Sequence, residues 1–211
     1  MDQKKFVSKD EVKEYTDLFS QVFSEIQEVL RKDKGLTFSY RLVGSAKRRL
    51  VIRHHNQGFD CDYQLFLQRN KKQMEPKEIK DALIKEFDAR MPAHGFKTCR
   101  NKKKAIEIRK KDSDGDKLIF KYDIVIMKEK DCPYIIHRSE NNVYVWNPES
   151  DYSTWAEDYG KIKGANMWDD LRNRYYDKKI QKDNGTNYVD RKSFQMLHEA
   201  VNETLNKFRI I

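Results

Sequence analysis

The sequence predicts an α+β fold with a mixed or antiparallel sheet, a long N-terminal helix and a small C-terminal helical lobe. Apolar side chains recur at three- and four-residue steps over residues 12–30. Residues 36–127 then hold several short segments rich in aromatic and β-branched residues, and helical periodicity returns after residue 150. This order is typical of α+β chains. We expect residues 1–150 to form the core and residues 151–211 to form a helical lobe packed on it.

The first helix is expected to begin just after Ser8. Ser8 and Glu11 have the spacing of a capping box, and Val7 is placed to act as the staple residue. The apolar positions run from Val12 onward, and Gly35 is a suitable terminator. This pattern predicts an amphipathic helix that packs one face onto a larger element.

Two strands are expected next. Residues 36–43 alternate in part and run directly into Gly44 and Ser45. Residues 59–67 are rich in aromatic and apolar side chains, which favours a strand despite two aspartates near its start. The first strand therefore ends in a Gly-Ser turn.

A second helix and a hairpin complete the predicted core. Pro76 stands at a favourable first helical position, and apolar residues spaced by four continue to Met91. Strands are expected over residues 104–109 and 117–127, joined by the turn-forming string 112–116. Beyond the core, helices are expected over three ranges with a loop before the last of them: 153–163, 166–182, 194–208 and the loop 183–187.

Composition narrows the function classes. The 211 residues include 43 Lys and Arg against 34 Asp and Glu, a net charge of +9 and a pI near 9.3. Such a basic protein favours a polyanionic partner, for example a nucleotide or a nucleic acid. No apolar run is long enough to span a membrane, and the first 30 residues lack a signal-peptide core. We therefore expect a cytoplasmic protein with no membrane partner.

The cysteines indicate no special chemistry. Cys61, Cys99 and Cys132 are far apart in the chain. This spacing favours neither a disulfide framework nor a zinc site built on paired cysteines. We expect reduced and mostly buried thiols.

Three aspartates carry the strongest chemical signal. Asp60 and Asp62 are two apart in a strand, so both carboxylates point to the same face of the sheet. Asp123 interrupts a strand that is otherwise largely apolar. A buried carboxylate without a partner costs several kcal/mol, and a shared divalent ion would meet that need. Hard oxygen ligands select magnesium or manganese over zinc.

The Gly-Ser turn supplies the second half of a candidate site. Gly44 permits close approach of a ligand, Ser45 offers a hydroxyl, and a run able to begin a helix follows with exposed amides. A phosphate chain requires these features. We include Lys47, which belongs to a basic group around this turn, as a third nucleotide-binding residue.

These residues resemble the signature of the nucleotidyltransferase superfamily that includes DNA polymerase beta, poly(A) polymerase, oligoadenylate synthase and the cGAS/DncV-like enzymes. The resemblance implies a polymerase-beta-like core in which Gly44 and Ser45 contact a nucleoside triphosphate. It further implies that Asp60, Asp62 and Asp123 are catalytic and bind two magnesium or manganese ions. The long helix before the Gly-Ser turn, and the 61 positions from Asp62 to Asp123, are most similar to the oligoadenylate-synthase and cGAS/DncV-like branch.

The implied activity is transfer of a nucleoside monophosphate from a triphosphate to a hydroxyl acceptor, with release of pyrophosphate. The acceptor is a nucleotide, an oligonucleotide such as RNA, or a macromolecule. A synthase of nucleotide signals is the favoured subclass. Two alternatives stay open, namely a toxin–antitoxin-type enzyme that modifies a protein or tRNA, and a non-catalytic RNA-binding protein with the same fold. In the simplest alternative the aspartates are a solvated pair and a salt bridge, and the Gly-Ser dipeptide is only a turn.

Overall fold

The computed structural model describes seven stretches of the chain: residues 6–53, 58–128, 133–138, 141–147, 160–162, 166–181 and 193–209. The chain divides into two compact units. One unit comprises residues 5–149, and the other comprises residues 150–211 together with residues 1–4.

Helix α1 (Lys9–Val29) opens the larger unit and continues into a π-helical turn over Leu30–Lys34. The Ser8 hydroxyl oxygen accepts a hydrogen bond from the Glu11 amide at 3.1 Å, which is half of the predicted capping box. Gly35 ends the helical segment in the left-handed region, with a φ of 67°. The amphipathic pattern thus forms the helix that it predicted.

Seven strands form one mixed sheet in this unit. Their order is β1-β2-β5-β4-β3, and β6 pairs with both β5 and β7. Strands β2 and β5 are parallel, whereas the other pairs are antiparallel. The strands are β1 (Leu36–Val43), β2 (Phe59–Asn70), β3 (Arg100–Asn101), β4 (Ile106–Lys111), β5 (Leu118–Lys128), β6 (Tyr134–Arg138) and β7 (Val143–Asn147).

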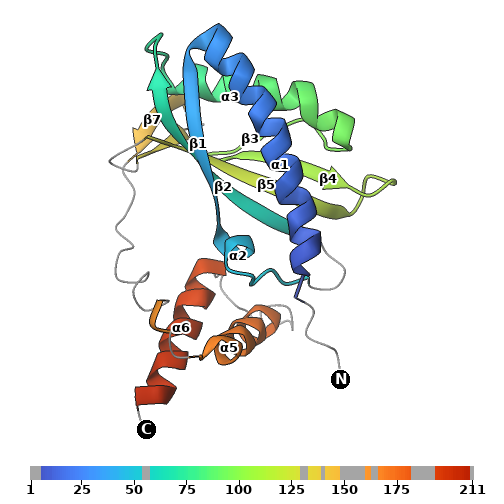
Figure 1. Ribbon diagram of the computed structural model, residues 1–211, viewed down its shortest axis with the longest axis vertical. Coiled ribbons are helices and arrows are strands. Elements are labelled where there is room, and N and C mark those ends of the chain that lie inside the picture. Colours follow the sequence, from blue (N-terminus) through green and yellow to red (C-terminus); the bar gives the residue numbers. More distant parts are fainter. Residues whose placement is uncertain are drawn as a thin grey trace. The chain divides into compact units, whose positions relative to one another are not determined.

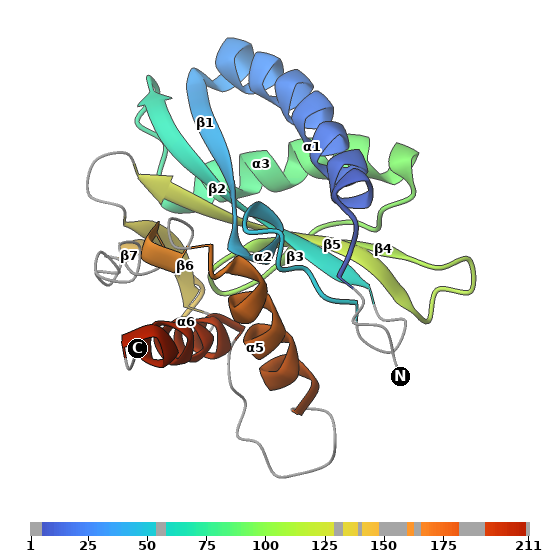
Figure 2. The ribbon, with the colours of Figure 1, turned by 60° about the horizontal axis from the view of Figure 1, so that its bottom comes forward.

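Two helices cover one face of the sheet (Figures 1 and 2). Helix α3 (Pro76–Arg90) carries the chain from β2 toward β4 and β5, so that β5 can run parallel to β2. It starts with the predicted proline and ends in the short helical turn Met91–His94. Phe19 of α1 and Phe87 of α3 meet with ring centroids 6.2 Å apart.

Aromatic packing fixes α1 on the sheet. The ring of Tyr15 stacks on Phe120 of β5 at 3.8 Å, and Phe19 stacks on Tyr63 of β2 at 3.7 Å. All four side chains are buried, and each such burial stabilises the fold by about 1.5–3 kcal/mol. Because side chains alternate along a strand, the residues next to Tyr63 on β2 and next to Phe120 on β5 point to the opposite face of the sheet.

The sequence did not predict the short strands β3, β6 and β7, whereas the helix expected to begin after the Gly-Ser turn is present as the short helix α2 (Gly44–Lys47). Strand β3 has only two residues, and β6 joins β5 through a single pairing, Met127 with Tyr134. Such elements depend on neighbours distant in sequence, not on a local pattern. The predicted helix over 153–163 lies almost entirely outside the described residues, and the predicted loop 183–187 lies wholly outside them.

The smaller unit contains helices α5 (Trp168–Gln181) and α6 (Ser193–Arg209). An ion pair joins them, with the Lys178 ammonium donating to Glu203 at 2.6 Å. Buried apolar side chains include Leu171 on α5 and Val201 on α6. Across the described parts of both units, no helix has the length and apolar character that crossing a membrane requires.

Candidate functional site

Strand β2 separates a buried face from a polar face. Phe59, Cys61 and Tyr63 are buried, whereas Asp60 and Asp62 alternate with them, point to the other side and are partly exposed. Burial raises the pKa of the Cys61 thiol to about 12, so this cysteine stays protonated at neutral pH. The two aspartates therefore share the face of the sheet that lies away from the aromatic core.

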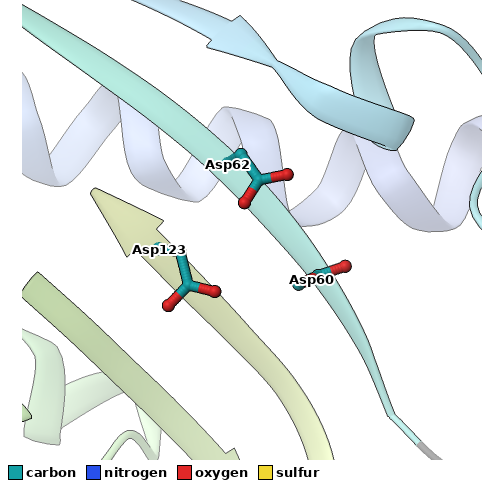
Figure 3. A group of neighbouring side chains, drawn as sticks. All are labelled: Asp60, Asp62 and Asp123. Carbon is teal, nitrogen blue, oxygen red and sulfur yellow. The ribbon is translucent and has the colours of Figure 1, made fainter. Parts of the chain in front are cut away.

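The parallel pairing of β2 with β5 brings the third aspartate beside them. Asp62 stands opposite Asp123, and Asp60 stands opposite Lys121. One carboxylate oxygen from each of the three aspartates lies within 4.8 Å of the other two. Figure 3 shows Asp60 and Asp62 on β2 and Asp123 on the neighbouring strand.

The grouping of negative charge is costly for Asp62. Burial, followed by the charges of Asp60 and Asp123, raises the pKa of the Asp62 carboxyl from 3.8 to about 7. The positive charges of Lys121 and Arg48 only partly oppose this shift. Among the residues that the structure describes, none donates a hydrogen bond to the Asp62 carboxylate. Asp62 is therefore the member of the cluster that would gain most from a bound cation.

Lys121 is the cation nearest to the other two aspartates. Its ammonium nitrogen lies 3.5 Å from Asp60 Oδ2 and forms a closer, hydrogen-bonded ion pair with Asp123 Oδ2. Burial lowers the pKa of Lys121, but the hydrogen bond to Asp123 and the nearby carboxylates outweigh burial and raise it. Lys121 is therefore charged at neutral pH.

Gly44 closes the cluster from the side of β1. Val43, the last residue of β1, pairs with Asp62, so the turn at Gly44 lies directly beside that carboxylate. A Cβ atom at position 44 would lie 2.0 Å from Asp62 Oδ2, which is impossible without a rearrangement. Gly44 also has a φ of +66°, in the left-handed region that favours glycine. Both observations require glycine at this position.

The two residues predicted to bind phosphate with Gly44 have different surroundings. Ser45 begins the turn of α2, where its carbonyl accepts hydrogen bonds from the amides of Arg48 and Leu50 at 3.1 and 2.9 Å. Lys47 is exposed at the end of α2. In the described part of the chain, no contact joins Lys47 to the three aspartates. The structure thus brings Gly44 to the aspartates and leaves Lys47 at the surface.

Sequence reasoning gave Glu107 and Lys121 no role in the site, and it included Arg48 only in the basic group around the turn. Arg48 Nη1 donates to the Gly44 carbonyl at 2.9 Å and so braces the turn. Glu107, on β4, is buried beside Asp123 and accepts a hydrogen bond from Arg109 at 3.0 Å. Lys121 precedes Asp123 by two positions in a strand, so the period of two already placed both on one face. The pairing of Lys121 with Asp60 and the pairing of β5 with β4 could not be predicted, because no local sequence pattern indicates them.

The cluster has the donor set of a hard divalent ion. Three carboxylates offer oxygen ligands close together, and Asp62 lacks another partner among the described residues. The glycine at position 44 makes room for the Asp62 carboxylate, because the Cβ of any other residue would lie 2.0 Å from Asp62 Oδ2. The residues present therefore fit a magnesium or manganese ion.

Comparisons with known proteins support the fold. No family model matches the chain, and the search of curated proteins finds no match. Among solved structures, Escherichia coli DncV in its 3'-deoxy GTP bound form matches with a TM-score of 0.65 and 14% identity, covering 94% of this chain and 68% of that one. E. coli MS115-1 CdnC with ATP matches with a TM-score of 0.56 and 14% identity, covering 97% and 62%.

The Vibrio cholerae DncV structure with bound GTP gives a TM-score of 0.56 at 15% identity and covers 87% of this chain. The chain spans about half the length of that protein, 51% in the GTP bound form and 46% in the 3'-deoxy ATP bound form. These neighbours are DncV and CdnC structures with bound nucleotides. The chain therefore has the polymerase-beta-like nucleotidyltransferase fold, in the form found in the DncV-like branch that its sequence resembles.

Proposed function

We propose that this protein is a metal-dependent nucleotidyltransferase that moves a nucleoside monophosphate from a nucleoside triphosphate to a hydroxyl acceptor and releases pyrophosphate. The observation that carries the proposal is the grouping of Asp60, Asp62 and Asp123 within 4.8 Å, directly beside the Gly44 turn. The structural neighbours with bound ATP or GTP add support for a triphosphate donor.

In this proposal Asp60, Asp62 and Asp123 hold one or two magnesium or manganese ions. Such ions polarise phosphoryl oxygens and make a nearby hydroxyl or water a better nucleophile. The contribution of the protein is to hold the ligand oxygens in fixed positions. Asp60 and Asp62 on β2 and Asp123 on β5 project from two rigid, paired strands, which keeps the ligand oxygens fixed relative to one another.

The Gly44 turn would contact the triphosphate. Glycine in general permits phosphate oxygens to approach the backbone, and the first amides of a helix have no acceptor within that helix. Ser45 would donate its hydroxyl, and the exposed Lys47 would reach the outer phosphates. Arg48 would keep the turn in shape through its hydrogen bond to the Gly44 carbonyl.

Asp123 is the candidate for the residue beside the attacking oxygen. The acceptor hydroxyl oxygen forms a bond to the α-phosphorus, the bond from that phosphorus to the bridging oxygen breaks, and pyrophosphate leaves. The hydroxyl proton passes to solvent water. A carboxylate within hydrogen-bond reach of the hydroxyl orients it for this attack. The net charge of +9 favours an anionic acceptor such as a nucleotide or RNA.

The test is product analysis with each of the four α-labelled nucleoside triphosphates, in magnesium or manganese, with and without RNA. We expect a new labelled species together with pyrophosphate. The double variant Asp60→Asn/Asp62→Asn should lose both products. The matched control is Asp17→Asn/Asp81→Asn, which removes two exposed carboxylates that pair only with neighbouring lysines on α1 and α3.

Two results would contradict the proposal. Full activity in the Asp60→Asn/Asp62→Asn variant would show that the cluster is not the active site. The absence of any product, combined with RNA binding that weakens with salt and ignores the metal, would identify a non-catalytic RNA-binding protein with this fold.

A further inference from the structure

A lysine contacts two of the three aspartates of the candidate metal site. Asp60 and Lys121 are register partners on β2 and β5, and Lys121 and Asp123 share a face of β5. The ammonium lies 3.5 Å from Asp60 Oδ2 and is hydrogen-bonded to Asp123 Oδ2. One cation thereby joins two of the three carboxylates, and it joins the two strands that carry them.

This ammonium and a divalent ion would compete for the same carboxylates. Without a cation, three carboxylates with oxygens within 4.8 Å of one another repel one another. Lys121 offsets part of the repulsion for Asp60 and Asp123. A divalent ion held by the same oxygens would repel the ammonium, because like charges a few ångströms apart are unfavourable.

The Lys121 ammonium can move away from the two aspartates toward Glu107. Its side chain is a flexible four-carbon stem, and 24% of it is exposed. Glu107 lies next to Asp123 across the β4–β5 pairing, and its charge also attracts the Lys121 ammonium. Glu107 already accepts a hydrogen bond from Arg109, so this part of the face is suited to cations.

We propose that Lys121 is a positioning residue that holds Asp60 and Asp123 in place before metal binding and leaves them when a divalent ion enters. Its ammonium keeps the carboxylates together in the metal-free protein and lowers the affinity for metal. The inference rests on the proposed metal site, and it adds a residue of this chain that controls how that site is filled.

The test is the Mn²⁺ affinity of the full chain, measured by electron paramagnetic resonance of free Mn²⁺, for the wild type and Lys121→Met. Removing the competing ammonium should tighten Mn²⁺ binding roughly tenfold or more, the scale on which one nearby unit charge shifts a proton equilibrium. Lys121→Arg keeps the charge and should bind Mn²⁺ like the wild type. Lys128→Met is the matched control, because it removes an exposed lysine from the end of the same strand.

The metal-free proteins provide a second readout. In EDTA, Lys121→Met should melt about 2–4 °C below the wild type, the shift expected when a chain of this size loses one weak ion pair. Saturating Mn²⁺ should remove that difference. A purely structural lysine predicts instead that Lys121→Met lowers both the melting temperature and the Mn²⁺ affinity. If Lys121→Met gives no cooperative unfolding transition, the same comparison is made with Lys121→Gln.

The outcomes separate this inference from the proposed function. Wild-type binding of Mn²⁺ with equal or weaker binding by Lys121→Met would overturn the role of Lys121 and leave the metal site standing. No Mn²⁺ binding by the wild type would overturn both. If Lys128→Met also binds Mn²⁺ more tightly than the wild type, the change in affinity comes from the lower net charge of the protein. That result would also overturn the inference.

Discussion

Asp62→Asn should make the metal-free protein more stable while removing the proposed nucleotidyl transfer. The Asp62 carboxyl has a pKa of about 7 in the folded chain, against 3.8 ordinarily. The folded state therefore binds the proton more tightly than the unfolded state does. As the pH rises from about 4 to 7, the carboxyl ionises in the unfolded state while the folded state keeps its proton, so stability is lost, and above pH 7 both states are ionised.

The size of the effect follows from the two pKa values. Each pH unit between them corresponds to about 1.4 kcal/mol. Relative to acid pH, Asp62 therefore lowers the free energy of unfolding by about 4 kcal/mol at pH 8, where it is ionised in both states, and by about 2 kcal/mol at pH 5, where only the unfolded state is ionised. Asparagine has nearly the same shape and carries no charge. Asp62→Asn should therefore raise the free energy of unfolding, and the gain at pH 8 should be about twice the gain at pH 5.

The assay is urea unfolding in EDTA at pH 5 and pH 8. Asp81→Asn serves as the control, because it removes an exposed carboxylate that pairs with Lys77 on α3, and its effect should be small beside that of Asp62→Asn. Excess Mg²⁺ should reverse the order of stability, since only the wild type can bind the ion tightly. A variant that is less stable than the wild type at pH 8 in EDTA would refute the assignment of Asp62 as an uncompensated carboxylate.

Three further predictions concern the same unit. Mn²⁺ affinity should fall about tenfold from pH 8 to pH 6, because Asp62, with a pKa of about 7, must lose its proton to bind the ion; titration of free Mn²⁺ at both pH values measures this. Gly44→Ala should abolish triphosphate binding, measured by calorimetry, because its Cβ would lie 2.0 Å from Asp62 Oδ2. Phe19→Ala should cost about 3–5 kcal/mol in urea unfolding, because its buried ring packs on Tyr63.

For each of these three predictions, a specific result would contradict it. Metal affinity that is flat between pH 6 and pH 8 would mean that Asp62 does not ligate the ion. For Gly44, the control is Gly115→Ala in the hairpin turn, which also has a positive φ of +78° but has no atom within 4 Å of the added Cβ. Equal loss of triphosphate binding in both variants would contradict a specific role for Gly44. A loss below about 1 kcal/mol for Phe19→Ala would contradict the packing of α1 on the sheet.

The local parts of the site could be predicted from the sequence. Alternation along residues 59–67 places Asp60 and Asp62 on one face, and the structure agrees, with Phe59 and Cys61 buried on the other. The end of β1 at Val43 and the turn at Gly44 could also be predicted from the sequence, because the strand pattern stops there at a glycine. These features depend on neighbours within a few residues.

The contacts between distant segments could not be predicted in the same way. The pairing of Asp60 with Lys121 follows from the parallel register of β2 and β5, which no local pattern encodes. The burial of Glu107 beside Asp123 depends on the register of β4. Among the cations after Gly44, Arg48 rather than Lys47 reaches the turn, because the short helix α2 directs its guanidinium back to the Gly44 carbonyl.

The most direct measurement of the central claim is a crystal structure of the protein with Mn²⁺ and a non-hydrolysable nucleoside triphosphate, using the anomalous signal of manganese to locate the ion. We predict manganese bound by the carboxylates of Asp60, Asp62 and Asp123, triphosphate against the Gly44 turn, and Lys121 moved away from Asp60. Manganese bound elsewhere, with Lys121 still paired to Asp60 and Asp123, would contradict the account.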